Sequence, residues 1–166
     1  PFIPGGSATL ADYKGSMFDR GHLAPAADMS FSLQAMSESF YMSNMSPQHP
    51  DFNRGVWKDL ESKVRDYALA CGEIYVVSGP VFEDDKTYVS IGKNKVSVPE
   101  KYYKVLLDTN AAHPKAIGFI LSNKGSKNDL STFAVSVDAV EYATGLNFFK
   151  ERFLRWKKQL VRNFTN

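Results

Sequence analysis

The chain has 166 residues, which suits one domain, because folding at this length hides roughly 70% of the surface that the unfolded chain would expose. Hydrophobic residues at 43% and charged residues at 23% are ordinary for a globular protein and exclude wholesale disorder. The formal net charge of +2 is too small to indicate a nucleic-acid partner by itself, because only clustered basic residues create a useful field.

Further classes of site and segment are excluded by what the sequence lacks. Cys71 is the lone cysteine, so an internal disulfide is excluded, and no spacing of Cys and His resembles a zinc site. No apolar run reaches the length of about 18 residues that a membrane span needs. No charged-then-apolar leader precedes Pro1. Because translation starts at Met, we expect a processed, trimmed or cut chain, and a removed leader stays open.

The first fifty residues predict short elements. In chain order these are an irregular stretch at 1–16, an extended piece at 17–23, a bend at Ala24-Pro25, a short helix from Ser30 to Glu38, and a second extended piece at 40–42. The bend is expected because the residue before a proline avoids the helical region. Ser30 or Ser32 is the expected N-cap of the short helix.

The clearest helix is predicted from Asp51 to Cys71. Its apolar stripe recurs at spacings of three and four and consists of Val56, Trp57, Leu60, Val64, Tyr67, Ala68 and Cys71. Gly72 supplies the expected C-terminal stop. At about 100° per residue, Asn53 projects on the side of this stripe and Glu61 lies at its edge. Both polar side chains can therefore face inward.

After this helix the sequence favours strands. Runs of β-branched and aromatic residues between breaks predict strands at 73–78, 87–91, 95–98, 102–108 and 117–121. The sequence GKNK at 92–95 is typical of a hairpin turn. Ser136 or Asp138 opens a helix that ends near Gly145, and an amphipathic terminal helix is predicted from Asn147 to Phe164. Its basic residues are interpreted as a solvated face.

This order of elements places two polar residues near each other. His22 ends the first strand and Asn53 begins the long helix, so the two meet if the first two strands pair as a hairpin and the helix packs across it. A neutral imidazole with a pKa near 6.5 can accept a proton from water at neutral pH. A hard cation held by an amide oxygen and waters can stabilise charge on a phosphate. Such an arrangement fits phosphodiester hydrolysis.

Each of these residues alone has an ordinary structural explanation. His22 would cap a strand end with a bond to the backbone, and Asn53 would be a helix N-cap. Asn44 would form a turn before Ser46-Pro47. Glu61 would be a surface carboxylate that pairs with Arg65 one turn later. Taken one at a time, these explanations are the better ones.

Two blocks of sequence taken together favour the catalytic interpretation. Asp-Arg-Gly-His stands at residues 19–22 and continues as Leu-Ala-Pro, and Ser-Asn-x-x-Pro-Gln at 43–48 precedes Asn-x-Gly-x-Trp-x-x-Leu-Glu at 53–61. Looser matches follow at 78–82 and 98–105. This arrangement resembles the DNA/RNA non-specific endonucleases of the ββα-metal, or His-Me finger, class, over residues 17 to 149. In this order and separation the two blocks form a specific signature.

The resemblance implies an α+β domain with a mainly antiparallel central sheet flanked by helices. By it, His22 would be the base that activates water, and Arg20 would pair with the scissile phosphate. Asn53 would be the sole direct protein ligand of Mg²⁺, with Mn²⁺ or another divalent ion as alternatives. Glu61 would hold a water of that ion, and Asn44 would help to position the histidine and the substrate.

The expected activity is sugar-non-specific cleavage of DNA and RNA that leaves 5′-phosphate ends, since contacts with the phosphodiester backbone carry no base information. Two alternatives stay open: a weakened nucleic-acid-binding domain, and a Mg²⁺-dependent phosphodiesterase acting on small substrates. Residues 1–166 are expected to be one nuclease domain that lacks an N-terminal part of the family fold. A secreted or periplasmic location is expected, because an unselective nuclease endangers its host. A homodimer is left open.

Overall fold

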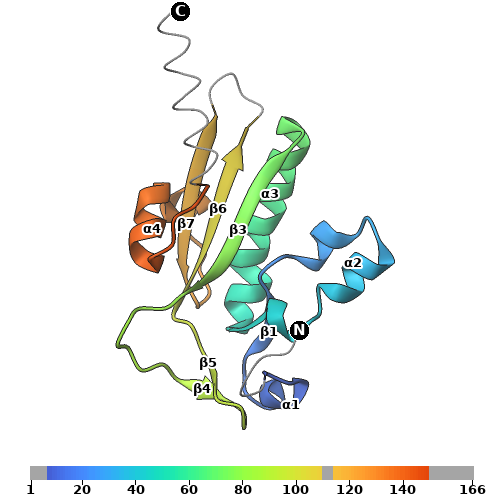
Figure 1. The fold of residues 1–166 in the computed structure, drawn as a ribbon, viewed down its shortest axis with the longest axis vertical. Coiled ribbons are helices and arrows are strands. Elements are labelled where there is room, and N and C mark those ends of the chain that lie inside the picture. Colours follow the sequence, from blue (N-terminus) through green and yellow to red (C-terminus); the bar gives the residue numbers. More distant parts are fainter. Residues whose placement is uncertain (1–6, 110–113, 150–166) are drawn as a thin grey trace, which may run out of the picture.

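The chain folds as an α+β domain in a computed structural model that describes residues 7–109 and 114–149 (Figure 1). The terminal helix expected from Asn147 to Phe164 lies, after residue 149, outside the described residues. Within these two ranges, none of the helices combines the length and the hydrophobicity needed to cross a bilayer.

The main layer is an antiparallel sheet with its four strands in the order β3, β6, β7, β8. These strands are β3 (Ile74–Val81), β6 (Lys101–Asp108), β7 (Lys115–Ser122) and β8 (Ala134–Val135). Helix α3 (Lys58–Cys71) runs along one face of the sheet, and α4 (Val137–Thr144) covers the other (Figure 1). The expected architecture, a mainly antiparallel sheet flanked by helices, is confirmed.

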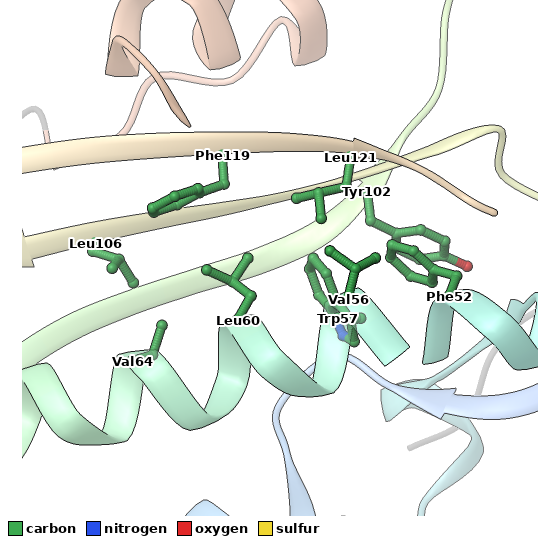
Figure 2. Packing of buried hydrophobic residues seen from close by; sticks show 9 residues of the cluster. All are labelled: Phe52, Val56, Trp57, Leu60, Val64, Tyr102, Leu106, Phe119 and Leu121. Carbon is green, nitrogen blue, oxygen red and sulfur yellow. The ribbon is translucent and has the colours of Figure 1, made fainter. Parts of the chain in front are cut away.

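The core follows from the alternation of side chains along β6. Tyr102 and Leu106 point toward α3, where they join a cluster with Phe52, Trp57 and Leu60 (Figure 2). Tyr103 and Val105 point the other way, into a second cluster beneath α4. The strand is therefore buried on both faces, and α3 gains its position from an apolar stripe that the sequence predicts.

The ends of α3 and α4 obey the expected capping rules. Gly72 follows α3 with a φ of 84°, and Gly145 follows α4 in the left-handed region at 67°, both conformations that favour glycine. The Ser136 hydroxyl caps α4 by accepting from the Ala139 N–H. The Ser32 side chain caps α2 (Leu33–Glu38) in the same way, which decides between the two candidates for that cap.

A separate two-stranded sheet carries the first motif. Strand β1 (Asp19–His22) pairs antiparallel with β2 (Met45–Gln48), with His22 opposite Met45. The prediction of an extended piece at 40–42 is wrong, because this segment turns into the 3₁₀ helix η2 (Met42–Asn44). The strand begins three residues later and contains Pro47, which is tolerated in a two-stranded ribbon whose strands both lie at edges.

The start of the long helix also differs from the prediction of one uninterrupted helix. Residues Phe52–Trp57 form a π-type turn, η3, before α3 begins. At Gly55 the backbone leaves helical geometry, with φ −108° and ψ −116°. The kink turns the residues before Gly55 relative to the axis of α3. The single 100° periodicity that relates Asn53 to Glu61 in the sequence is therefore broken at this point.

The remaining elements are short. They are α1 (Leu10–Tyr13), η1 (Ala26–Met29), β4 (Ser90–Ile91), β5 (Val96–Ser97) and η4 (Leu130–Phe133). Strands β4 and β5 form the expected hairpin around residues 92–95. Helix α1 contradicts the irregular lead-in predicted for 1–16. Its Asp12 accepts from both the backbone and the side chain of Asn94 in that hairpin, a long-range contact that local sequence does not reveal.

Candidate active site

Strand β1 presents His22 because a glycine precedes it. A Cβ atom at Gly21 would overlap the side chain of Gln48, which is fully buried beneath the strand. The Gln48 amide in turn donates to the main-chain oxygen of His22 at 3.4 Å. The small residue at position 21 thus lets the two strands close tightly, and the histidine is held at the end of β1.

The imidazole of His22 is partly buried. Its ring meets Phe40 edge-on, with 4.7 Å between centroids and 85° between planes. The Nε2 atom is buried and has no hydrogen-bond partner among the described residues. Burial lowers the pKa of His22 from its ordinary value, and the positive charge of Arg20 lowers it further. Both effects favour the neutral form of the ring, and Nδ1 is not among the buried side-chain atoms that lack a partner.

Asn53 is held by Asp19, on the strand that carries His22. The Asn53 Nδ2 donates to Asp19 Oδ2 at 2.9 Å. Arg54 donates to the same carboxylate, from Nε to Oδ2 at 2.8 Å and from Nη2 to Oδ1 at 2.7 Å. These bonds hold the pKa of Asp19 below its usual range. The backbone N–H of Asn53 donates to the oxygen of His49, so Asn53 lies inside the first turn and is no N-cap.

Glu61 lies one turn into α3, half-buried. Burial raises its pKa to about 7, and the nearby Asp28 raises it too, while Lys104 and Arg65 act in the opposite direction. The alternative explanation of Glu61 as an ion-pair partner of Arg65 is not supported, because Arg65 Nη1 binds Asp28 Oδ1 at 2.9 Å. Glu61 thus keeps a carboxylate that takes up or releases a proton near neutral pH.

Two cavities meet at these residues. One, of about 550 Å³, is lined by Tyr13, Arg20, Phe40 and others, and a second, of about 560 Å³, is lined by Lys58, Glu61 and Arg65 with the loop at 25–27. His22, Asn53 and Arg54 line both. The histidine and the asparagine, 31 positions apart in the sequence, therefore face a shared space, with Arg20 on one side and Glu61 on the other.

Asn44 is placed differently. Its side-chain oxygen accepts from the Ala24 N–H at 2.9 Å, and its nitrogen donates to the oxygens of Ala24 and Ser39 at 2.9 and 2.8 Å. It lines neither of the two cavities that His22 lines. All these side-chain bonds go to the backbone of Ala24 and Ser39, near the two ends of the segment that follows His22, so the side chain fixes that segment.

Lys104 is a neighbour of the site that the sequence analysis missed. Its side chain is 1% exposed, its Nζ donates to Ser78 Oγ at 2.6 Å, and it lies 4.5 Å from the centre of the Trp57 ring. Burial lowers its pKa to about 8. The signal was available: a strand buried on both faces that alternates Tyr102, Lys104 and Leu106 places the lysine inward.

The oxygen donors at the two cavities fit a hydrated divalent ion. Over the described ranges, no group of three or more His, Cys, Asp or Glu side chains could hold a metal, which disfavours zinc and a carboxylate cage. Asn53 offers an amide oxygen, because its nitrogen is engaged by Asp19. Glu61 offers a carboxylate across the second cavity. One neutral oxygen ligand with waters held by a nearby carboxylate suits an ion that dehydrates reluctantly.

Comparisons with known proteins agree with the sequence motifs. A sequence model of the DNA/RNA non-specific endonucleases matches residues 1–153. Human mitochondrial endonuclease G is 40% identical over 152 residues, which are 85% of this chain and 51% of that protein. Nuclease C1 of Cunninghamella echinulata is 42% identical over 153 residues, 86% of this chain and 61% of that protein.

The likeness extends to a solved structure. A crystal structure of an EndoG/EndoGI complex, which concerns the mechanism of EndoG inhibition, contains a chain with a TM-score of 0.82 and 34% identity to this one. The match covers 89% of this chain and 65% of that chain. The mitochondrial nuclease EXOG of Xenopus laevis is 40% identical over 158 residues, which are 87% of this chain and 44% of that protein. The chain thus spans about half the length of these curated relatives.

One expectation is contradicted by the relatives. A secreted or periplasmic location was expected, but endonuclease G, EXOG and nuclease 1 of Schizosaccharomyces pombe are all named as mitochondrial. The expectation rested on the danger of an unselective nuclease to its host. That argument calls only for separation from the host's nuclear nucleic acid, and an organelle provides this as well as export does.

Proposed function

The chain belongs to the DNA/RNA non-specific endonuclease family, and from this premise we propose that it hydrolyses phosphodiester bonds in both DNA and RNA and leaves 5′-phosphate ends. The observation that carries the proposal is the shared space lined by His22 and Asn53. A neutral imidazole and a free amide oxygen on two sides of one space are what the hydrolysis of a phosphate diester requires.

His22 is the general base. Its Nδ1 takes a proton from the attacking water, and the lowered pKa that burial gives the ring favours the neutral form that can accept this proton. Phe40 packs against the ring and limits its rotation. The ring is thus oriented before substrate arrives, which lowers the entropy cost of reaching the transition state.

Asn53 and Glu61 would hold the divalent ion, Asn53 through its side-chain oxygen and Glu61 through water. When bound, the ion neutralises negative charge on the phosphate and on the departing oxygen. Mg²⁺ is the ion that this donor set suits best, with Mn²⁺ as a substitute.

Arg20 binds the scissile phosphate. It is exposed on the strand that carries His22, it lines the first cavity, and its charge is close enough to lower the pKa of His22. A guanidinium matches two phosphate oxygens at once. Asn44 acts on substrate only through the loop that it fixes. Because these contacts are all to the phosphodiester, both sugars are accepted and base preference is weak.

The test uses supercoiled plasmid, structured RNA and a p-nitrophenyl phosphodiester, with Mg²⁺ or with a chelator. We expect the protein to degrade both nucleic acids with Mg²⁺ and neither with chelator. Cleavage of the small diester alone would make the protein a small-substrate phosphodiesterase. Binding of nucleic acid without cleavage of any substrate would make it a binding domain.

The matched variant is His22→Ala. Loss of the base should reduce cleavage by about a hundredfold to ten-thousandfold. Plasmid cleavage at the wild-type rate would reject His22 as the base, and wild-type cleavage that persists in chelator would reject the metal. Labelled product ends that carry 3′-phosphate instead of 5′-phosphate would reject the assigned direction of cleavage.

A further inference from the structure

Asp19 is the residue that the proposed mechanism leaves without a task. It opens strand β1 and faces the cavity of His22, yet as an anion it opposes a phosphate. A carboxylate there lowers the affinity for a phosphate substrate unless neighbouring donors and cations neutralise its charge. Both its oxygens are taken up: Oδ1 accepts from Arg54, and Oδ2 accepts from both Arg54 and Asn53.

The contact with Asn53 decides which end of the amide faces the metal. Only the nitrogen of a side-chain amide can donate to a carboxylate, because the oxygen would be repelled by it. Asn53 lies in the turn η3, two residues before Gly55, where the backbone leaves helical geometry. Without a partner for Nδ2, the amide could turn over and present N–H groups, which cannot ligate a cation.

From these contacts we infer that Asp19 is the positioning residue of the metal site: by accepting the Asn53 N–H, its carboxylate turns the Asn53 oxygen toward the ion. The inference rests on the proposed function, since it assigns Asn53 as the ligand. It also explains why the aspartate and the histidine of the motif lie on one short strand. Strand β1 then positions the base directly through His22 and the metal ligand indirectly through Asp19. The relative position of base and ligand is therefore set by one short backbone segment.

Arg54 has a supporting role. Its side chain is 71% exposed and forms a two-point ion pair with Asp19. A solvated pair of this kind contributes little stability. Its effect on the site is to spread the charge of Asp19 and to hold the carboxylate plane, while the amide contact of Asn53 survives its removal.

The test compares Asp19→Ala with Arg54→Ala, because both remove the same ion pair but only the first removes the partner of Asn53. Mn²⁺ affinity, measured by calorimetry or by the loss of the free-ion signal in electron paramagnetic resonance, reads out the site without any turnover. We expect Asp19→Ala to weaken Mn²⁺ binding by about ten- to a hundredfold, as loss of an outer partner of a ligand does. Arg54→Ala should weaken it by less than about threefold, on the same scale.

Two further variants keep the inference falsifiable. Asp19→Leu keeps a side chain of similar size but has no acceptor for the Asn53 N–H, so Mn²⁺ binding should weaken as in Asp19→Ala. In an Asn53→Ala background, Asp19→Ala should have no additional effect on Mn²⁺ affinity, since its target is gone. Thermal unfolding of each metal-free variant identifies any that fails to fold, and if Asp19→Ala does not fold, Asp19→Leu decides.

The outcomes separate the inference from the proposed function. Absence of Mn²⁺ binding by the wild type, or equal binding by Asn53→Ala, would contradict the proposed function. Wild-type Mn²⁺ affinity in folded Asp19→Ala or Asp19→Leu would overturn the inference alone. An equal loss in Arg54→Ala and Asp19→Ala would also overturn it, because the ion pair and not the amide contact would then set the site.

Discussion

The four-stranded sheet and the β1–β2 unit are stabilised in different ways, although α3 belongs to both. On the sheet side, fully buried apolar residues such as Trp57 and Leu60 contact many neighbours, so each contact is one of a large number. On the β1–β2 side a smaller apolar cluster around Met45 is joined by single polar bonds, such as those of Asn44 and Asp19. The comparison teaches that stability and chemistry are assigned to opposite sides of one helix.

The largest effect is expected on the polar side, from Asn53→Ala. Loss of the proposed metal ligand should reduce metal-dependent plasmid cleavage by at least about a hundredfold, more than the loss of an outer partner. The melting temperature should change little, because Asn53 contributes one hydrogen bond to Asp19. The exposed Asn128 offers a control, and Asn128→Ala should cleave as the wild type does. A large fall in melting temperature for Asn53→Ala would contradict the claim that the polar side contributes chemistry more than stability.

The reverse result is expected on the apolar side, from Leu60→Ala. Leu60 is fully buried between α3 and the sheet, and the cavity left behind should lower the free energy of unfolding by about 2–5 kcal/mol. Urea titration measures this loss. Cleavage per folded molecule, assayed well below the unfolding transition, should stay within about twofold of wild type. A selective loss of cleavage with unchanged stability would show that the two sides are not separable.

Glu61 lies between the two sides of α3, and its protonation should make the free energy of unfolding depend on pH. Its pKa is about 7 in the fold against 4.5 for an ordinary Glu, so between these values the folded protein binds more protons than the unfolded chain. Raising the pH from 5 to 8 should therefore destabilise the metal-free wild type relative to Glu61→Gln, by on the order of 2 kcal/mol. Urea unfolding in chelator at both pH values measures the difference. An identical pH dependence in the two proteins would mean that burial does not perturb this carboxyl group.

The smallest effect is expected where neither kind of contact exists. Leu33 at the start of α2 is 93% exposed, and Leu33→Ser should change the free energy of unfolding by less than about 0.5 kcal/mol and leave cleavage unchanged. The matched measurement on Leu60→Ser, at a buried position, sharpens the contrast. A stability loss above about 1 kcal/mol at position 33 would contradict the description of this surface as uninvolved in the fold.

The apolar side was the more predictable from sequence, for a physical reason. Its signals are local: the stripe of α3 repeats every three to four residues, and Gly72, Ser136 and Gly145 mark helix ends through their own backbone preferences. The strand at 102–108 was recognised by its β-branched and aromatic residues, and the structure extends it by one residue, to Lys101.

The features that sequence failed to predict depend on distant partners. Asp12 of α1 accepts a hydrogen bond from Asn94, which lies 82 positions later in the sequence, and Asp19 accepts one from Asn53, 34 positions later. The kink at Gly55 and the strand containing Pro47 run against local preferences and exist because tertiary packing overrides them. The roles of His22 and Asn53 came from motif resemblance, since each residue alone has an ordinary structural explanation.

The most direct measurement is a crystal structure of the His22→Ala protein with a short DNA duplex and Mn²⁺, which is located by its anomalous scattering. The account predicts that the ion is bound to the side-chain oxygen of Asn53 and contacts a DNA phosphate. The space vacated by the ring of residue 22 should lie on the opposite side of that phosphorus. An ion bound away from Asn53, or a phosphate reached by only one of the two positions, would contradict it.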